Sequence, residues 1–197
     1  NIRHEKARVD LSLPKFRENG LSILDDAYDK GVRFFDASPG YGLAESLLIE
    51  WLHQKNDPDI IVATKWGLSY VADFHIDATV HEIKEHSLEK LNQQWEFSKK
   101  RLPNLKIYQI HSATLDTGVL DNIAILLRLH QIRREYNISI GLTTTGANQV
   151  EVLKKAIDIE IENEPLFNSF QSTYNIMEQS ILQLKEIFLG SNRQLII

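Results

Sequence analysis

The run Ile60-Ile61-Val62-Ala63-Thr64-Lys65 decides the fold class of this 197-residue chain. Its apolar and β-branched residues follow one another almost without interruption, which is typical of a strand in a parallel sheet covered by helices. Five further runs share this character, the last two less clearly: residues 32–36, 107–111, 138–142, 167–173 and 194–197. The sequence therefore predicts six strands.

The stretches between these runs carry apolar residues three and four positions apart and so predict amphipathic helices. The residues that mark them are Leu21, Leu24 and Tyr28; Leu47, Leu48, Trp51 and Leu52; Val80, Ile83, Leu88, Leu91 and Trp95; Leu120, Ile123 and Leu127; and Ile181, Leu184 and either Ile187 or Phe188. Strands that alternate with helices indicate βα units, hence an α/β protein. Since no Pro- or Gly-rich linker interrupts them, we predict one domain over residues 1–197.

Two architectures can be built from such units. The open sheet that binds dinucleotides carries Gly-x-Gly-x-x-Gly after its first strand, and Gly40 and Gly42 do not fit that pattern. We therefore predict the alternative, a (β/α)8 TIM barrel, which usually takes about 250 residues. The first thirteen residues are polar and hold no predicted strand, and the last run stops at Ile197 within an apolar strand. We expect an incomplete barrel whose first and last units are missing from this chain.

Composition and charge exclude several classes of protein. A formal charge of -5, from 22 Lys+Arg and 27 Asp+Glu, argues against a broad basic face for nucleic acid. The absence of Cys excludes disulfides, Cys nucleophiles and Cys-based metal sites. No apolar run approaches the roughly 20 residues that span a bilayer, and the printed chain opens without a basic-then-apolar leader. We expect a soluble, cytoplasmic protein that binds neither membrane nor nucleic acid.

Three successive predicted strands end on a polar side chain that can take part in chemistry: Asp36, Lys65 and His111. Because the strands of a TIM barrel end at its active site, we expect these side chains to meet. Each also has an ordinary interpretation, as a loop cap, a rim residue or a buried histidine. Their matching placement on three strands favours a site, and Tyr41 follows Asp36 by five residues in the next loop.

These four residues suit the reduction of a carbonyl group. A phenol with its usual pKa of about 10 is a poor acid at neutral pH. The ammonium of Lys65 would lower the pKa of Tyr41, and the carboxylate of Asp36 would hold that ammonium in place. His111 can donate a hydrogen bond to a carbonyl oxygen on which negative charge develops. Together these four side chains would allow the carbonyl oxygen to gain a proton while the carbonyl carbon gains a hydride.

Four segments, in this order along the chain, resemble signatures of the aldo-keto reductase family. They are residues 31–42 with Glu45 and Leu48, residues 61–67, residues 87–91 with 107–111, and residues 170–175. The resemblance extends from about residue 15 to residue 197. It implies that Tyr41 is the proton donor, that Asp36 and Lys65 tune it, and that His111 orients the carbonyl.

The same resemblance implies an oxidoreductase that uses NADP(H), with NAD(H) left open, on a small carbonyl or alcohol substrate. The family commonly holds the nicotinamide carboxamide with Ser-Asn after the strand at 138–142, where this chain has Thr143 and Thr144, and with a glutamine that corresponds to Gln171. We therefore expect these three residues to bind the cofactor. The particular substrate and the oligomeric state stay open.

The sequence also leaves room for two other functions, and one pair of histidines resembles a metal site. A catalytically weak barrel could bind the nucleotide as a regulatory or sensor subunit. An aldolase could use Lys65 as a Schiff base, but this needs a lowered lysine pKa, which a nearby Asp36 opposes. His81 and His86 are five residues apart, whereas the zinc-protease motif needs four, and on a helix they would diverge by about 140°. We expect a solvated helix face there and no metal.

Overall fold

A computed structural model of the chain describes residues 12–75 and 77–197. They form a six-stranded sheet in which every neighbouring pair is parallel. Its strands, in order across the sheet, are β1 (Phe34–Asp36), β2 (Ile61–Trp66), β5 (Leu105–Ile110), β6 (Ser139–Thr143), β9 (Ser169–Gln171) and β10 (Gln194–Ile196). All six predicted strands are confirmed, with shorter or slightly shifted bounds. The sheet follows chain order throughout, as in consecutive units of a β/α barrel.

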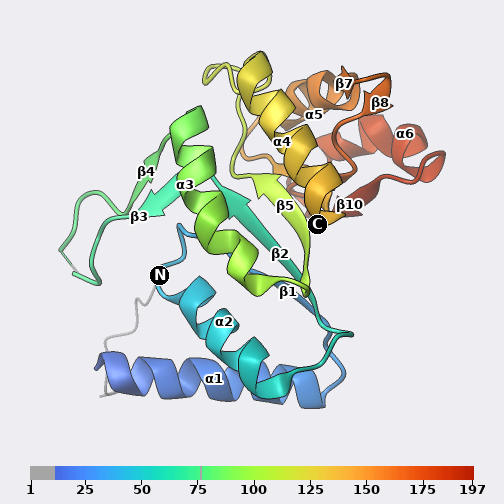
Figure 1. The fold of residues 1–197 in the computed structure, drawn as a ribbon. Helices are drawn as coiled ribbons and strands as arrows, with labels where there is room; N and C mark the ends of the chain where they lie inside the picture. The colour runs from blue at the N-terminus through green and yellow to red at the C-terminus, as the bar shows by residue number, and fades with distance from the viewer. Residues whose placement is uncertain (1–11, 76) are drawn as a thin grey trace.

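Helices lie in chain order along this sheet, from the blue α1 to the red α6 (Figure 1). They are α1 (Leu13–Asp29), α2 (Ala44–Lys55), α3 (Leu88–Ser98), α4 (Ile123–Tyr136), α5 (Gln149–Ile157) and α6 (Lys185–Leu189), with the 3-10 helices η1 (Lys99–Arg101) and η2 (Ser180–Leu184). Within the described ranges, no helix has both the length and the apolar character needed to cross a membrane.

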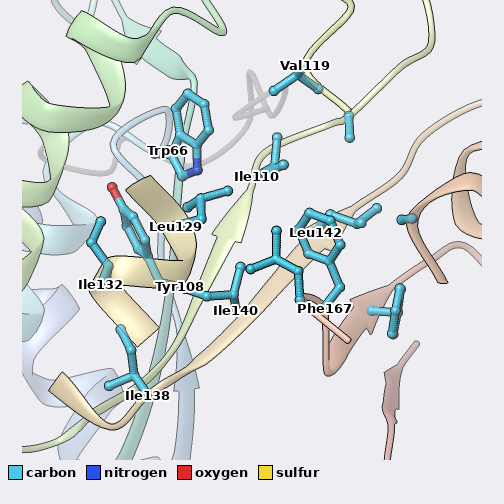
Figure 2. Packing of buried hydrophobic residues seen from close by; sticks show 14 of the residues in the cluster. Trp66, Tyr108, Ile110, Val119, Leu129, Ile132, Ile138, Ile140, Leu142 and Phe167 are labelled. Carbon is cyan, nitrogen blue, oxygen red and sulfur yellow. The ribbon is translucent and has the colours of Figure 1, made fainter. Parts of the chain in front are cut away.

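The helix-covered face of the sheet contains the main hydrophobic core. Alternate residues of each strand point toward the helices, so Tyr108 of β5 and Ile140 and Leu142 of β6 pack with Leu129 and Ile132 of α4 (Figure 2). These five side chains have no accessible surface. Burying one such side chain contributes about 1.5–3 kcal/mol, so this layer holds the strands in register.

The opposite, concave face carries smaller and more polar side chains toward the carboxyl ends of the strands. Gly141 of β6 is required there, because a Cβ atom at this position would lie 2.4 Å from the carbonyl oxygen of Ser169 on β9. Near the other end of the strands, Phe34 and Ile61 are each 39% exposed. Such apolar exposure on the concave face is what a sheet curved toward a barrel presents before further strands close it.

The predicted helix over residues 80–95 is wrong in its first half. Instead, β3 (Leu68–Tyr70) and β4 (Glu82–Lys84) pair as an antiparallel two-stranded sheet, which projects from the main sheet (Figure 1). Ile83 pairs with Ser69 in that small sheet. Helix α3 begins only after Ser87, whose hydroxyl accepts a hydrogen bond from the Lys90 backbone N–H at 3.0 Å. The spacing of Val80 and Ile83 imitates a helix, but strand pairing and the cap at Ser87 decide the local structure.

Two smaller features differ from the sequence predictions, and one prediction falls mostly outside the described residues. Ile123 and Leu127 were expected to mark a buried helix face, but α4 leaves them 61% and 51% exposed and buries Ile125 and Leu126 instead. Helix α5 and the hairpin of β7 (Glu160–Ile161) and β8 (Glu164–Pro165) were not predicted. The expectation that residues 1–13 hold no strand concerns residues 1–11 that lie outside the described ranges, while Leu13 begins α1.

Candidate active site

The sheet brings the three polar strand ends together, as predicted. Asp36 is the last residue of β1, Lys65 is the second-last residue of β2, and His111 directly follows β5. The backbone N–H of His111 donates to the carbonyl of Trp66 at 2.8 Å, which extends the β2–β5 pairing by one residue. Because β1, β2 and β5 are adjacent and parallel, all three side chains lie at the carboxyl ends of neighbouring strands.

Lys65 is buried and held by two oxygen atoms. Its ammonium forms an ion pair with the carboxylate of Asp36 and donates to the carbonyl of Ala37 at 3.2 Å. The side chain of Lys65 is 1% exposed. Burial lowers the pKa of Lys65, while the charge and hydrogen bond of Asp36 oppose that change. The sequence argument foresaw the opposing effect of Asp36 but not that burial is the larger one.

Tyr41 lies over this pair. Its backbone N–H donates to the carbonyl of Ser38 at 3.0 Å, and this turn brings the ring over the ends of the strands. The ring centroid is 5.0 Å from Nζ of Lys65 and 5.5 Å from the His111 ring centroid, and the two rings stand at 90° to each other. Tyr41 is 46% exposed, so a ligand can approach it from the solvent side.

The pKa of Tyr41 moves opposite to the predicted direction. Partial burial and the negative charges of Asp36 and Glu82 raise it above 10. Lys65 was expected to lower it, but its ammonium lies against the ring face and is paired with Asp36. The phenol therefore keeps its proton at neutral pH, as a proton donor must before it reacts.

His111 is fixed at both its ring and its main chain. Nδ1 lies 2.8 Å from Oγ of Ser38, and the carbonyl oxygen of His111 accepts a hydrogen bond from Nε2 of His86 at 2.9 Å. Burial lowers the pKa of His111 to about 3, and the positive charges of Lys65, His86 and Lys84 act in the same direction. The imidazole is thus neutral in ordinary buffers.

Sequence reasoning missed the parts played by Ser38 and His86. His86 was placed on a solvated helix face, whereas it is half-buried just after β4, 5.6 Å from the Trp66 ring between centroids. Its ring fills the space beside Gly67, where a Cβ atom would lie 2.3 Å from the imidazole. The glycine at position 67 is the sequence feature that marks this close approach, and in the structure its φ is 103°.

The three predicted cofactor-binding residues lie at the ends of β6 and β9. The hydroxyl oxygen of Thr143 accepts from the backbone N–H of Ser112 at 2.8 Å. The Thr144 hydroxyl donates to Oγ of Ser172 at 3.2 Å, and Ser172 in turn donates to Gln149. Both threonines are therefore already bonded to the surrounding loops.

Gln171 differs from these threonines. Its Oε1 atom is buried and meets no donor among the residues that the structure describes. A buried acceptor without a partner is unfavourable by about 1–3 kcal/mol, and the amide N–H of a nicotinamide carboxamide would satisfy it. The residues present therefore fit this cofactor at Gln171. Across residues 12–75 and 77–197, no group of three or more His, Asp or Glu side chains is arranged to hold a metal ion.

Six parallel strands covered by helices, with Asp36, Lys65 and His111 at their carboxyl ends, define an α/β-barrel protein whose candidate active site lies at the mouth of the barrel. The chain belongs to the aldo/keto reductase family, whose family profile it matches over residues 13–186. It is 32% identical over 123 residues to an L-galactose dehydrogenase of Arabidopsis thaliana, which covers 60% of this chain and 36% of the plant protein.

Solved structures agree on the fold. The aldo-keto reductase of Bacillus halodurans in its holo form superposes with a TM-score of 0.69 at 20% identity, over 91% of this chain and 56% of the other. The glycerol dehydrogenase of Gluconobacter oxydans gives a TM-score of 0.67 at 20% identity, over 90% and 52%. The described sheet is therefore part of the TIM-barrel fold of this family, and the chain spans little more than half of these structures.

Proposed function

We propose that the protein carrying this chain reduces an aldehyde or ketone to an alcohol, or catalyses the reverse oxidation, with NADP(H). One observation carries the proposal: the buried Lys65–Asp36 pair lies beneath the face of Tyr41, and His111 stands edge-on beside the same ring. Residues 1–197 would form a single, incomplete TIM-barrel domain, whose remaining strands complete the pocket in the whole protein.

The four side chains would divide the chemistry between them. A reduced nicotinamide, when bound, supplies the hydride. Tyr41, protonated at neutral pH, donates its proton to the carbonyl oxygen, and Lys65 lies close enough to offset the negative charge left on the phenol. Asp36 holds Lys65 in place, and His111 donates a hydrogen bond that orients the carbonyl. Gln171 would bind the carboxamide, with Thr143 and Thr144 supporting the loops around it.

The alternatives account for fewer of these features. A barrel that only binds a nucleotide has no use for a buried ammonium beneath a tyrosine. A Schiff-base lysine must reach the carbonyl carbon of its substrate, but Lys65 is 1% exposed and its ammonium is bonded to Asp36 and Ala37. We therefore favour the reductase. The name of the plant relative makes L-galactose the first sugar to test, beside a panel of small aldehydes.

The deciding experiment replaces Tyr41 by Phe in the full-length protein. Because the ring stays and the acid is lost, we expect kcat to fall by about 10²–10⁴-fold, with the Kd for NADPH unchanged. Tyr136→Phe, on α4 and packed against Trp95, is the matched control and should behave as the parent. A Tyr41→Phe protein that turns over substrate at the parent rate would contradict the mechanism.

A further inference from the structure

The ring of His111 is held by a fully buried serine. Ser38 has no accessible surface, and its Oγ lies 2.8 Å from Nδ1 of His111 and 3.1 Å from the backbone nitrogen of Gly40. Ser38 and Gly40 lie in the short loop between β1 and α2 that also carries Tyr41, whereas His111 follows β5. The proton donor and the ring beside it are thus linked through a single hydroxyl group.

Counting protons assigns the direction of each hydrogen bond. The N–H of Gly40 can only donate, so Oγ of Ser38 accepts from it. The hydroxyl has one proton of its own, and within the described residues the acceptor available to it is Nδ1 of His111. A buried hydroxyl proton needs an acceptor, so Nδ1 receives this bond and carries no proton itself.

The state of the ring follows. His111 is neutral, because burial lowers its pKa to about 3. A neutral imidazole has one protonated nitrogen, and with Nδ1 bare the proton resides on Nε2. Nε2 makes no hydrogen bond to the residues that the structure describes, so its N–H is the group left to meet a ligand oxygen.

We propose that Ser38 is a positioning residue whose hydroxyl holds His111 in the Nε2–H tautomer, so that this N–H is presented to the substrate carbonyl. The role at the carbonyl rests on the proposed function, whereas the tautomer itself does not. The main chain supports the same arrangement, since His86 holds the carbonyl of His111 and Trp66 holds its N–H. With the backbone fixed at two points, the serine hydroxyl decides which nitrogen is protonated.

The test that needs no activity is nitrogen NMR of the full-length protein labelled in its histidine rings. The His111 signals are identified by their loss in His111→Gln. In the parent we expect a bare Nδ1 and a protonated Nε2, and in Ser38→Ala we expect a mixture of tautomers. A parent spectrum with the proton on Nδ1 would overturn the proposal even if Ser38→Ala failed to fold, and so would an unchanged tautomer in the variant.

Kinetics then separate this inference from the proposed function. Removing a donor to a developing oxyanion outright lowers kcat by about 10²–10³-fold. A mixture of tautomers keeps part of the rings in the Nε2–H form, so Ser38→Ala should lower kcat by a smaller factor, in proportion to the fraction of Nε2–H tautomer that the NMR spectrum shows to be lost. The Kd for NADPH should stay as in the parent, and Ser38→Thr, which keeps the hydroxyl, should restore most of kcat. Ser169→Ala removes the same oxygen from another fully buried serine and should change neither kcat nor the tautomer.

Two outcomes distinguish the role of Ser38 from the proposed function. A tautomer shift in a protein that reduces no carbonyl would support the role of Ser38 and contradict the proposed function. An active parent with an unchanged kcat and an unchanged tautomer in Ser38→Ala would overturn the role of Ser38 and leave the proposed function standing.

Discussion

At the scale of single residues, Gln171 and Thr144 differ in what their side chains are free to bind. Oε1 of Gln171 is buried without a donor within the described ranges, whereas the Thr144 hydroxyl already bonds to Ser172. We expect Gln171→Ala to weaken NADPH binding by about 1–3 kcal/mol, the value of a lost buried partner, and Thr144→Ala to weaken it less.

Fluorescence quenching on titration with NADPH measures both changes. Gln54→Ala, on the exposed surface of α2, serves as the control for loss of a glutamine amide. If Thr144→Ala loses more affinity than Gln171→Ala, the nicotinamide is not where we place it.

His111 should make stability depend on pH. Its pKa falls from about 6.5 in the unfolded chain to about 3 in the folded protein. As the pH drops below 6.5, His111 becomes protonated in the unfolded chain but stays neutral in the folded protein. The free energy of unfolding is therefore highest above pH 6.5 and falls on acidification. Between pH 8 and pH 5 this amounts to about 2 kcal/mol. Urea unfolding at the two pH values should show a smaller loss in His111→Gln, and an equal loss would show that His111 is not buried as a neutral ring.

At the scale of elements, a buried ion pair joins α2, β2 and η1. Arg101 of η1, whose side chain has no accessible surface, pairs with Glu45 of α2, and Thr64 of β2 donates to the same carboxylate. Burial lowers the pKa of Arg101 to about 10, so it stays charged at neutral pH. This contact fixes the start of α2, and with it the loop of Tyr41, against the sheet.

Breaking one half of that pair should be costly. Arg101→Met leaves the carboxylate of Glu45 buried without its partner, which is expected to lower the free energy of unfolding by about 3–5 kcal/mol. The double variant Glu45→Leu with Arg101→Met should recover most of the loss, because no charge then remains buried. Arg17→Met breaks the exposed pair with Glu50 and should cost at most about 1 kcal/mol in the same urea titration. Equal costs at the two sites would contradict the buried role.

At the scale of the whole molecule, the described sheet has two open edges, at β1 and β10. Phe34 and Ile61 are 39% exposed on its concave face, and open edges beside apolar surface favour association between chains. We expect the isolated polypeptide of residues 1–197 to aggregate or to stay partly unfolded. Size-exclusion chromatography with thermal melting decides this, and a monodisperse protein that melts cooperatively would refute the expectation.

The six strands, α2 and the four polar residues at the barrel mouth could be predicted from the sequence alone. Two kinds of local signal made this possible: continuous apolar runs such as residues 60–65, and the helical spacing of Leu47, Leu48, Trp51 and Leu52. The period of apolar residues along the chain indicates whether an element is buried on both faces or along one stripe. The same holds for Asp36, Lys65 and His111, because parallel strands end at one edge whatever their exact register.

Tertiary structure alone decided the rest. Val80 and Ile83 have helical spacing, but the segment 82–84 forms a strand paired with β3. His86 was expected on a solvated helix face, but its ring donates a hydrogen bond to the carbonyl of His111. The pKa of Tyr41 rose because burial, Asp36 and Glu82 surround it, and its direction could not be read from residue types. These outcomes depend on contacts that only the folded chain sets, because no local pattern encodes their distances or their degree of desolvation.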